Sequence, residues 1–96
     1  MIGIVAILKV KANKVADFEA SFTDLQKTVR AEEPGCTQYD FFKNSGEENT
    51  YVIMEQYKSQ ADVDAHMASP HFQAAAAGFG DVLAEAPGLH FLSKVS

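Results

Sequence analysis

The chain has 96 residues, of which 47% are hydrophobic and 22% are charged, and its formal net charge is −5. We expect a single domain over residues 1–96, because this length supports one core and little more. The eight Lys and Arg residues are scattered along the chain, which argues against partners such as nucleic acid or an anionic membrane, since both need clustered positive charge.

Residues 2–11 form the first expected element, a β-strand. Alternate positions from Ile2 to Val10 are apolar, and the intervening positions remain apolar as far as Ile7. A strand with two apolar faces is typical of a central strand that is covered on both sides.

Two features favour a cytoplasmic location. The segment 1–10 lacks a basic leading region and a small-residue cleavage site, and Lys9 and Lys11 interrupt it too early for a membrane span. The single Cys36 cannot form an internal disulfide, as expected for a reducing compartment.

A long helix from an Asn13 cap to about Glu33 is expected next. The segment 34-PG-35 ends this helix. Its apolar residues recur at spacings of three and four and so form one stripe: Val15, Phe18, Phe22, Leu25, Val29. The runs 36–43 and 50–57 flank the turn-forming segment 44–49 and predict a β-hairpin.

The remaining residues predict a broken helical segment and a last strand. Ser59 is a predicted helix cap, and Ser69 followed by Pro70 indicates a second helix start. Gly78 and Gly80 weaken the final helix, so we expect a distortion there. The segment 87-PG-88 ends it, and residues 89–95 form the last strand.

The element order is therefore β-α-β-β-α-β. It predicts an α+β fold, a ferredoxin-like sandwich in which helices cover one face of an antiparallel four-stranded sheet. The other sheet face would then be bare, although the strands are apolar on both faces, with Val5 and Ile7 against Ile4 and Leu8, and Ile53 against Val52 and Met54. Such a face is unusual on a monomer, so we expect a homodimer through the sheet face.

The stretch 66-HMASPHF-72 contains the histidines of greatest interest. His66 and His71 are five residues apart, about 140° around a helix, with Pro70 between them, and no second ligand cluster exists. No metal site is therefore expected. His66 is either a boundary residue or a proton-exchanging group at the edge of an apolar pocket. His71 is either a polar residue of a first helical turn or part of the site.

The seven Phe and three Tyr residues either fill the core or line a pocket for a planar ligand. The run 74-AAAA-77 either leaves room for a ligand or lets its helix sit close to the sheet. Cys36 has no basic neighbour in the sequence and is expected to be inert. No dinucleotide, phosphate-loop or nucleophile motif is present.

The segments 33-EPGCTQY-39 and 55-EQYKSQADVDAHMASPHF-72 resemble the antibiotic biosynthesis monooxygenase (ABM) domain. The similarity spans nearly the whole chain and implies a dimeric α+β barrel. Within that family it implies a cofactor-independent oxidoreductase that converts a small quinol or anthrone-like substrate to a quinone with O2. Haem degradation does not fit, because the chain has no Trp, Tyr57 stands at the tryptophan position and the first strand has no Asn.

The resemblance implies a site with three catalytic residues, His66 as proton acceptor and Tyr57 and Tyr39 as hydrogen-bonding partners. The substrate-binding residues that it implies form a second group: Phe42, Met54, His71, Phe72, Phe79. No metal or cofactor is expected. Two other functions remain open, a dimer that binds a small aromatic ligand without turnover and another activity such as modification of a signal molecule. A third interpretation is a ligand-free structural dimer.

Overall fold

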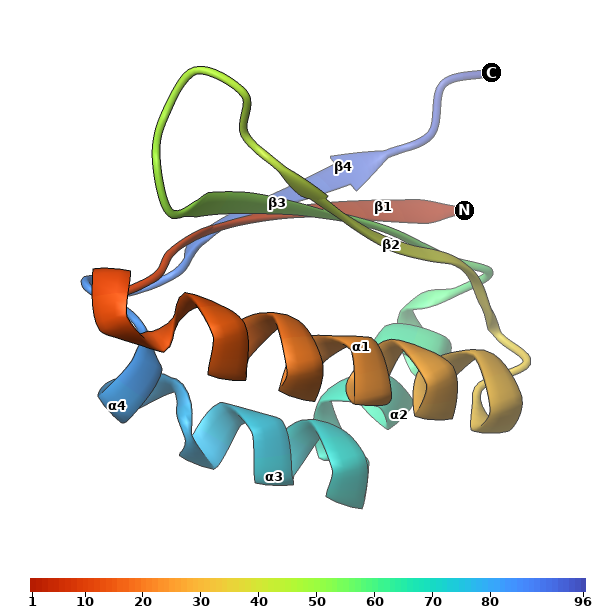
Figure 1. Ribbon diagram of the computed structural model, residues 1–96. Helices are drawn as coiled ribbons and strands as arrows, with labels where there is room; N and C mark the ends of the chain where they lie inside the picture. The colour runs from red at the N-terminus through yellow and green to blue at the C-terminus, as the bar shows by residue number, and fades with distance from the viewer.

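The computed structural model describes residues 1–96 and has two layers, a four-stranded sheet and a layer of helices on one of its faces (Figure 1). The elements follow in chain order: β1 (Ile2–Lys9), η1 (Ala12–Lys14), α1 (Val15–Glu32), β2 (Cys36–Lys43), β3 (Thr50–Tyr57), α2 (Gln60–Ala68), α3 (Pro70–Ala77), α4 (Phe79–Val82), β4 (Gly88–Ser93). None of the helices is long and apolar enough to cross a lipid bilayer.

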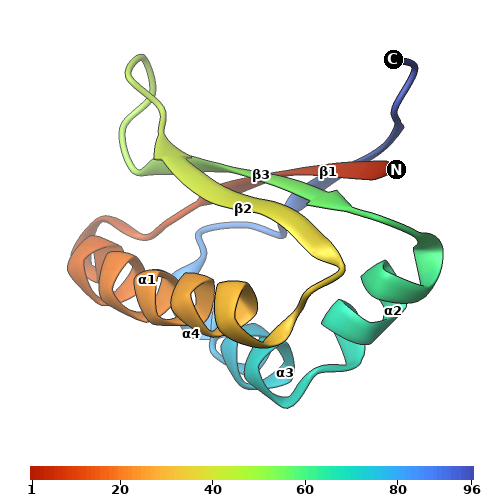
Figure 2. The same ribbon diagram turned by 90° about the vertical axis from the view of Figure 1, so that its right-hand side faces the viewer.

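The sheet order is β2-β3-β1-β4 and all neighbours are antiparallel. The two halves of the chain therefore each add one strand beside the central pair β1 and β3. This arrangement confirms the predicted ferredoxin-like α+β fold and the predicted hairpin of β2 and β3. In Figure 2 the helices all lie below the sheet, and the opposite face has no covering element.

The core lies between the sheet and α1. The α1 residues at spacings of three and four are buried as predicted: Phe18, Phe22, Leu25, Val29. Strand alternation places every second strand residue on the face toward the helices. The α1 residues pack against these inward-facing strand residues: Ala6, Leu8, Tyr39, Tyr51, Ile53. The core thus holds α1 firmly on the β2–β3–β1 side of the sheet.

The start of α1 differs from the prediction. Asn13 lies within the short 3-10 turn η1, and the residue that precedes α1 is Lys14, which makes no side-chain cap. The 3-10 turn itself redirects the chain from β1 into the helix, with the Lys14 amide donating to the Lys11 carbonyl at 2.8 Å. The predicted cap at Asn13 therefore lies one residue before the observed cap position at Lys14.

The predicted break in the second helical segment is confirmed. Ser59 caps α2 by accepting from the Asp62 amide, and Ser69 caps α3 by accepting from the Phe72 amide, with Pro70 at the first turn of α3. The final helix is split at Gly78 into α3 and α4. The chain then returns to the sheet.

The uncovered sheet face carries several exposed apolar side chains. Phe42, Met54 and Leu92 are 51%, 40% and 50% exposed, and Val5 and Ile7 of β1 are partly buried among them. This face is therefore apolar at its centre, as the alternation of β1 and β3 predicts.

Candidate active site

A cavity of about 220 Å³ lies between the helices and the sheet. Eleven of its fourteen lining residues are hydrophobic, so its wall is dry except at a few points. Its polar side chains are the phenol of Tyr39, the carboxyl of Glu55 and the imidazole of His66. A largely apolar cavity with a few convergent polar groups is the usual form of a small-molecule site.

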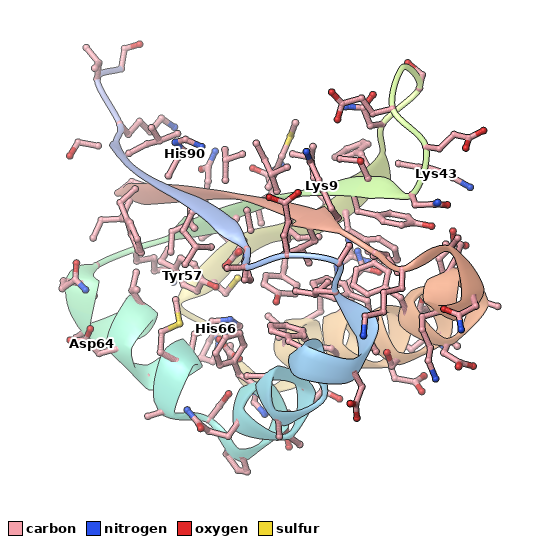
Figure 3. All side chains as sticks on the ribbon, turned by 90° about the vertical axis from the view of Figure 1, so that its left-hand side faces the viewer. Lys9, Lys43, Tyr57, Asp64, His66 and His90 are labelled. Atoms are coloured by element: carbon pink, nitrogen blue, oxygen red, sulfur yellow. The ribbon has the colours of Figure 1, made fainter.

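His66 enters this cavity from α2. The helix buries Val63 and His66, which lie three residues apart on one face, and His66 is only 1% exposed. Its Nδ1 atom lies 2.9 and 3.0 Å from the two carboxylate oxygens of Glu33. Figure 3 shows His66 and Tyr57 between the sheet and the helices, whereas His90 lies on the opposite side of the sheet.

The contact with Glu33 determines which ring nitrogen of His66 is available. A neutral imidazole has one N–H donor and one acceptor, and a carboxylate can only accept, so the proton lies on Nδ1. Nε2 is then the basic nitrogen, and no protein group bonds to it. Every fully buried side-chain nitrogen and oxygen has a partner, so Nε2 is not fully buried. We infer that Nε2 faces the cavity that His66 lines.

The surroundings of His66 favour its neutral, basic form. Burial lowers the pKa of His66 below its usual value near 6.5, while the Glu33 carboxylate opposes this shift. Three aromatic rings enclose the imidazole, with centroids at 4.8 Å for Phe72, 5.3 Å for Tyr39 and 5.4 Å for Tyr57. A neutral imidazole oriented by a carboxylate is the arrangement of a general base.

Glu33 also holds the second histidine. His71 Nε2 lies 2.5 Å from Glu33 Oε2, and His71 Nδ1 lies 3.7 Å from Glu32 Oε2. His71 lines a separate hollow of about 330 Å³ at the corner that follows α1, together with Glu32 and Glu33. The two imidazoles therefore contact one carboxylate, and only His66 reaches the inner cavity.

The corner after α1 places Glu33 for this role. A Cβ atom on Gly35 would lie 2.1 Å from Asp62 Oδ1 and 2.2 Å from Asp62 Cγ, so a larger residue there would have to displace the Asp62 side chain. The Gly35 carbonyl accepts from the Lys58 amide at 2.9 Å. These contacts fix the corner against the start of α2, the helix that carries His66.

Glu55 lies on β3 and is the second ionisable group of the cavity wall. It is 8% exposed, and its Oε1 accepts from the Tyr57 hydroxyl at 2.6 Å. Burial raises the pKa of Glu55 to about 7; the Tyr57 hydrogen bond reduces the rise and the nearby charge of Glu33 adds to it. Burial also raises the pKa of the Tyr39 hydroxyl, which keeps it protonated at neutral pH.

The structure brings together four of the expected site residues, Tyr39, His66, Phe72 and Phe79, in the cavity wall. The small side chain of Ala76 also lines it, so the alanine run of α3 does leave space beside the sheet.

Two expected wall residues lie elsewhere. Phe42 and Met54 lie on the uncovered sheet face, since they alternate with the inward-facing Phe41 and Ile53, so their expected place in the cavity wall is wrong. Tyr57 lies behind Glu55 rather than in the wall. Its buried hydroxyl donates to that carboxyl, so it contacts a wall residue and not the cavity itself.

Glu33 and Glu55 are the functional candidates that sequence reasoning missed, although both stand in the segments that resemble the ABM domain. The position of Glu55 in the site could have been predicted from the sequence. In β3 it alternates with Tyr51, Ile53 and Tyr57, so a carboxyl group was due on the apolar face of the sheet. That of Glu33 could not, because its contacts with the histidines join residues more than 30 positions apart.

The remaining reactive side chains offer no further chemistry at this site. Burial raises the pKa of the Cys36 thiol to about 11, with the charge of Glu33 adding to the rise, so the thiolate is scarce at neutral pH. No group of three or more His, Cys, Asp or Glu side chains is arranged to hold a metal ion.

Comparison with known proteins identifies relatives of this chain. A family model described as "Antibiotic biosynthesis monooxygenase" matches residues 1–78. The chain is 42% identical over 73 residues to "Putative monooxygenase YcnE" of Bacillus subtilis, a match that covers 76% of each protein.

Solved structures agree with this result. A "putative antibiotic biosynthesis monooxygenase" from Caulobacter crescentus CB15 superposes with a TM-score of 0.95 at 40% identity, over 99% of this chain and 90% of the other. Rv0793 of Mycobacterium tuberculosis superposes with a TM-score of 0.92 at 22% identity, over 99% of this chain and 95% of the other. The second likeness concerns the fold alone.

Proposed function

Because the chain belongs to the antibiotic biosynthesis monooxygenase family, we propose that it is a cofactor-independent monooxygenase that oxidises a small quinol with O2. The observation that carries this proposal is the imidazole of His66, which contacts Glu33 through Nδ1 and lines a largely apolar cavity. The expected chemistry begins with a base in an apolar enclosure.

The first step is proton transfer from a substrate hydroxyl to Nε2 of His66. O2 reacts slowly with closed-shell molecules, but a phenolate can donate one electron to it. Glu33 stabilises the imidazolium that forms, because its carboxylate lies within 3.0 Å of Nδ1. The apolar wall raises the energy of the free anion and favours electron release.

The remaining steps balance without an external reductant. Semiquinone and superoxide combine at a ring carbon, the O–O bond breaks, one oxygen atom stays on the ring and the other leaves as water. A hydroquinone and O2 thus give a hydroxyquinone and water, with four electrons leaving the substrate and four reducing O2.

The cavity volume favours substrates with one or two rings. An apolar cavity of about 150 Å³ accommodates benzene, and the cavity here measures about 220 Å³. A three-ring anthrone would require the mouth near Pro87 and Leu89 to open or leave part of the molecule outside. We therefore narrow the expected substrate to one-ring and two-ring quinols.

An aerobic screen of hydroquinones, naphthoquinols and anthrones tests the proposal through oxygen uptake and quinone absorbance. We expect turnover of a quinol and a loss of about 10²–10⁴-fold in kcat for His66→Ala, the range for removal of a general base. Asp64→Asn is the matched control, because Asp64 is an exposed residue of the same helix. Oxygen uptake by His66→Ala at the wild-type rate would refute the role of His66.

Ligand binding without turnover is the second candidate, and the same cavity supports it. It predicts saturable binding of quinols, measured by calorimetry, with no oxygen uptake. The ligand-free structural interpretation is weaker, since the space between helices and sheet is not filled by side chains.

We also propose that two copies of the chain pair through the uncovered sheet face. Its exposed side chains Phe42, Met54 and Leu92 would be buried by an identical face, which is the arrangement of a twofold dimer. Sedimentation of the wild-type protein should show dimers, and Met54→Asp should shift them to single subunits. Single subunits for the wild-type protein at micromolar concentration would refute this proposal.

A further inference from the structure

Glu55 is the one carboxyl group in the cavity wall, and the proposed base does not use it. No Lys, Arg or His lies within ion-pair distance of it, and its single protein partner is the Tyr57 hydroxyl on Oε1. A buried carboxylate without a cation is strongly disfavoured. The group therefore favours the neutral acid, which has a proton to donate.

The second carboxyl oxygen of Glu55 is the one free to act. Oε2 has no protein partner. Because every fully buried side-chain oxygen has a partner, Oε2 is not fully buried. We infer that it is accessible from the cavity that Glu55 lines. The Tyr57 hydroxyl donates to Oε1, and this bond orients the carboxyl with its other oxygen toward the cavity.

We propose that Glu55 is the general acid that protonates the departing oxygen atom when the O–O bond of the substrate hydroperoxide breaks. This inference rests on the proposed function and adds the step that the base cannot perform. His66 removes a proton from the substrate, and Glu55 delivers a proton to the oxygen that leaves as water. The hydrogen of the attacked ring carbon supplies the second proton of the water, the imidazolium returns its proton to Glu55, and both groups regain their starting forms.

The position of Glu55 in the sheet supports a division of labour with His66. Glu55 is the cross-strand partner of Ile4 on one side and of Tyr39 on the other, and cross-strand partners on one face lie about 5 Å apart. The Tyr39 ring centroid is in turn 5.3 Å from that of His66. A one-ring substrate beside Tyr39 can therefore contact the base on α2 and the acid on β3.

The alternative outcome of the same intermediate makes the role of Glu55 measurable. If no acid assists cleavage of the O–O bond, the C–O bond breaks instead, and the departing peroxide takes the proton of the His66 imidazolium and leaves as H2O2. The quinol and O2 then give the plain quinone and H2O2 in a two-electron reaction. A missing acid should thus change the products as well as the rate.

The test is Glu55→Gln in the full-length protein with the quinol that the wild-type enzyme turns over. We expect H2O2 to rise from a minor product to most of the oxygen consumed, measured by the oxygen that catalase returns, and kcat to fall about 10²-fold. Mass spectrometry should show plain quinone in place of hydroxyquinone. Glu55→Asp should restore part of the hydroxyquinone, because it restores an acid.

Glu19→Gln is the matched control. Glu19 likewise accepts from a tyrosine hydroxyl, that of the buried Tyr51, but it lies on the outer part of α1 and not in the cavity wall. Its change to Gln should leave the product ratio unaltered. A wild-type product ratio for Glu55→Gln would overturn the proposal while leaving the monooxygenase function intact, whereas absence of turnover in the wild-type protein would overturn both.

Discussion

The unpaired carboxyl of Glu55 should leave a clear mark on stability as the pH changes. Because burial raises the pKa of Glu55 to about 7 from a usual value of 4.5, the folded chain holds a proton there that the unfolded chain releases between these values. Wild-type stability should therefore fall as the pH rises from 4.5 to 7 on account of this group. Glu55→Gln cannot titrate and should not show that loss.

The expected size of the effect follows from the same shift. One pKa unit corresponds to about 1.4 kcal/mol, so a shift from 4.5 to about 7 gives about 3 kcal/mol. The free energy of unfolding of Glu55→Gln, minus that of the wild type, should thus increase by about 3 kcal/mol between pH 4.5 and pH 8. The amide oxygen of Gln can still accept from Tyr57, so the hydrogen bond is not the source of the change.

Urea unfolding at fixed protein concentration, followed by circular dichroism at several pH values, measures this difference. His66 and the other titrating groups are present in both proteins and largely cancel. Glu19→Gln serves again as the control, because the Glu19 side chain is 46% exposed, and its stability difference should stay constant with pH. A constant difference for Glu55→Gln as well would show that the Glu55 carboxyl is ionised in the folded protein and would refute the reasoning.

Three further predictions follow from the site and its supporting corner. Glu33→Gln should lower kcat by about 10²–10⁴-fold through loss of the charge that stabilises the His66 imidazolium, and ¹⁵N NMR should report an altered His66 tautomer; an unchanged kcat would contradict the role of Glu33. Ala76→Phe should fill the cavity and abolish quinol binding by anaerobic calorimetry while the melting temperature is kept, and an unchanged Kd would place the ligand elsewhere. Gly35→Ala should destabilise the fold by about 1–3 kcal/mol, and a double-mutant cycle should show Asp62→Ala relieving most of that loss.

Much of the fold could be predicted because the spacing of apolar residues indicates which face of each helix or strand is buried. The α1 stripe from Phe18 to Val29 and the alternation of β1 and β3 each specify a face, and the joint at Ser69 and Pro70 has a local cause in proline geometry. The start of α1 could not be predicted, because Asn13 is a good cap residue in general. A 3-10 turn in that place depends on how the chain leaves the sheet.

The site was only partly predictable, for a different reason. His66 and Tyr39 could be proposed from the family resemblance, but the contact between Glu33 and His66 joins the end of one helix to another helix across the fold. The resemblance implies that Phe42 and Met54 bind substrate, but strand alternation places them on the face of the sheet opposite to the cavity. Position on the strand was the better guide than aromatic or apolar character.

The polar groups of the cavity all lie toward one end, since Tyr39 and Glu55 belong to β2 and β3, while Leu89 lies on the far edge strand β4. Leu89 is 48% exposed, so this end borders the outside. A guest molecule would therefore enter with its hydroxyl groups leading and leave its opposite end near the edge of the sheet. If the proposed function holds, the site should be selective for the head of a substrate and tolerant of alkyl tails of different lengths, and oxygen should attach at a ring position set by that entry direction.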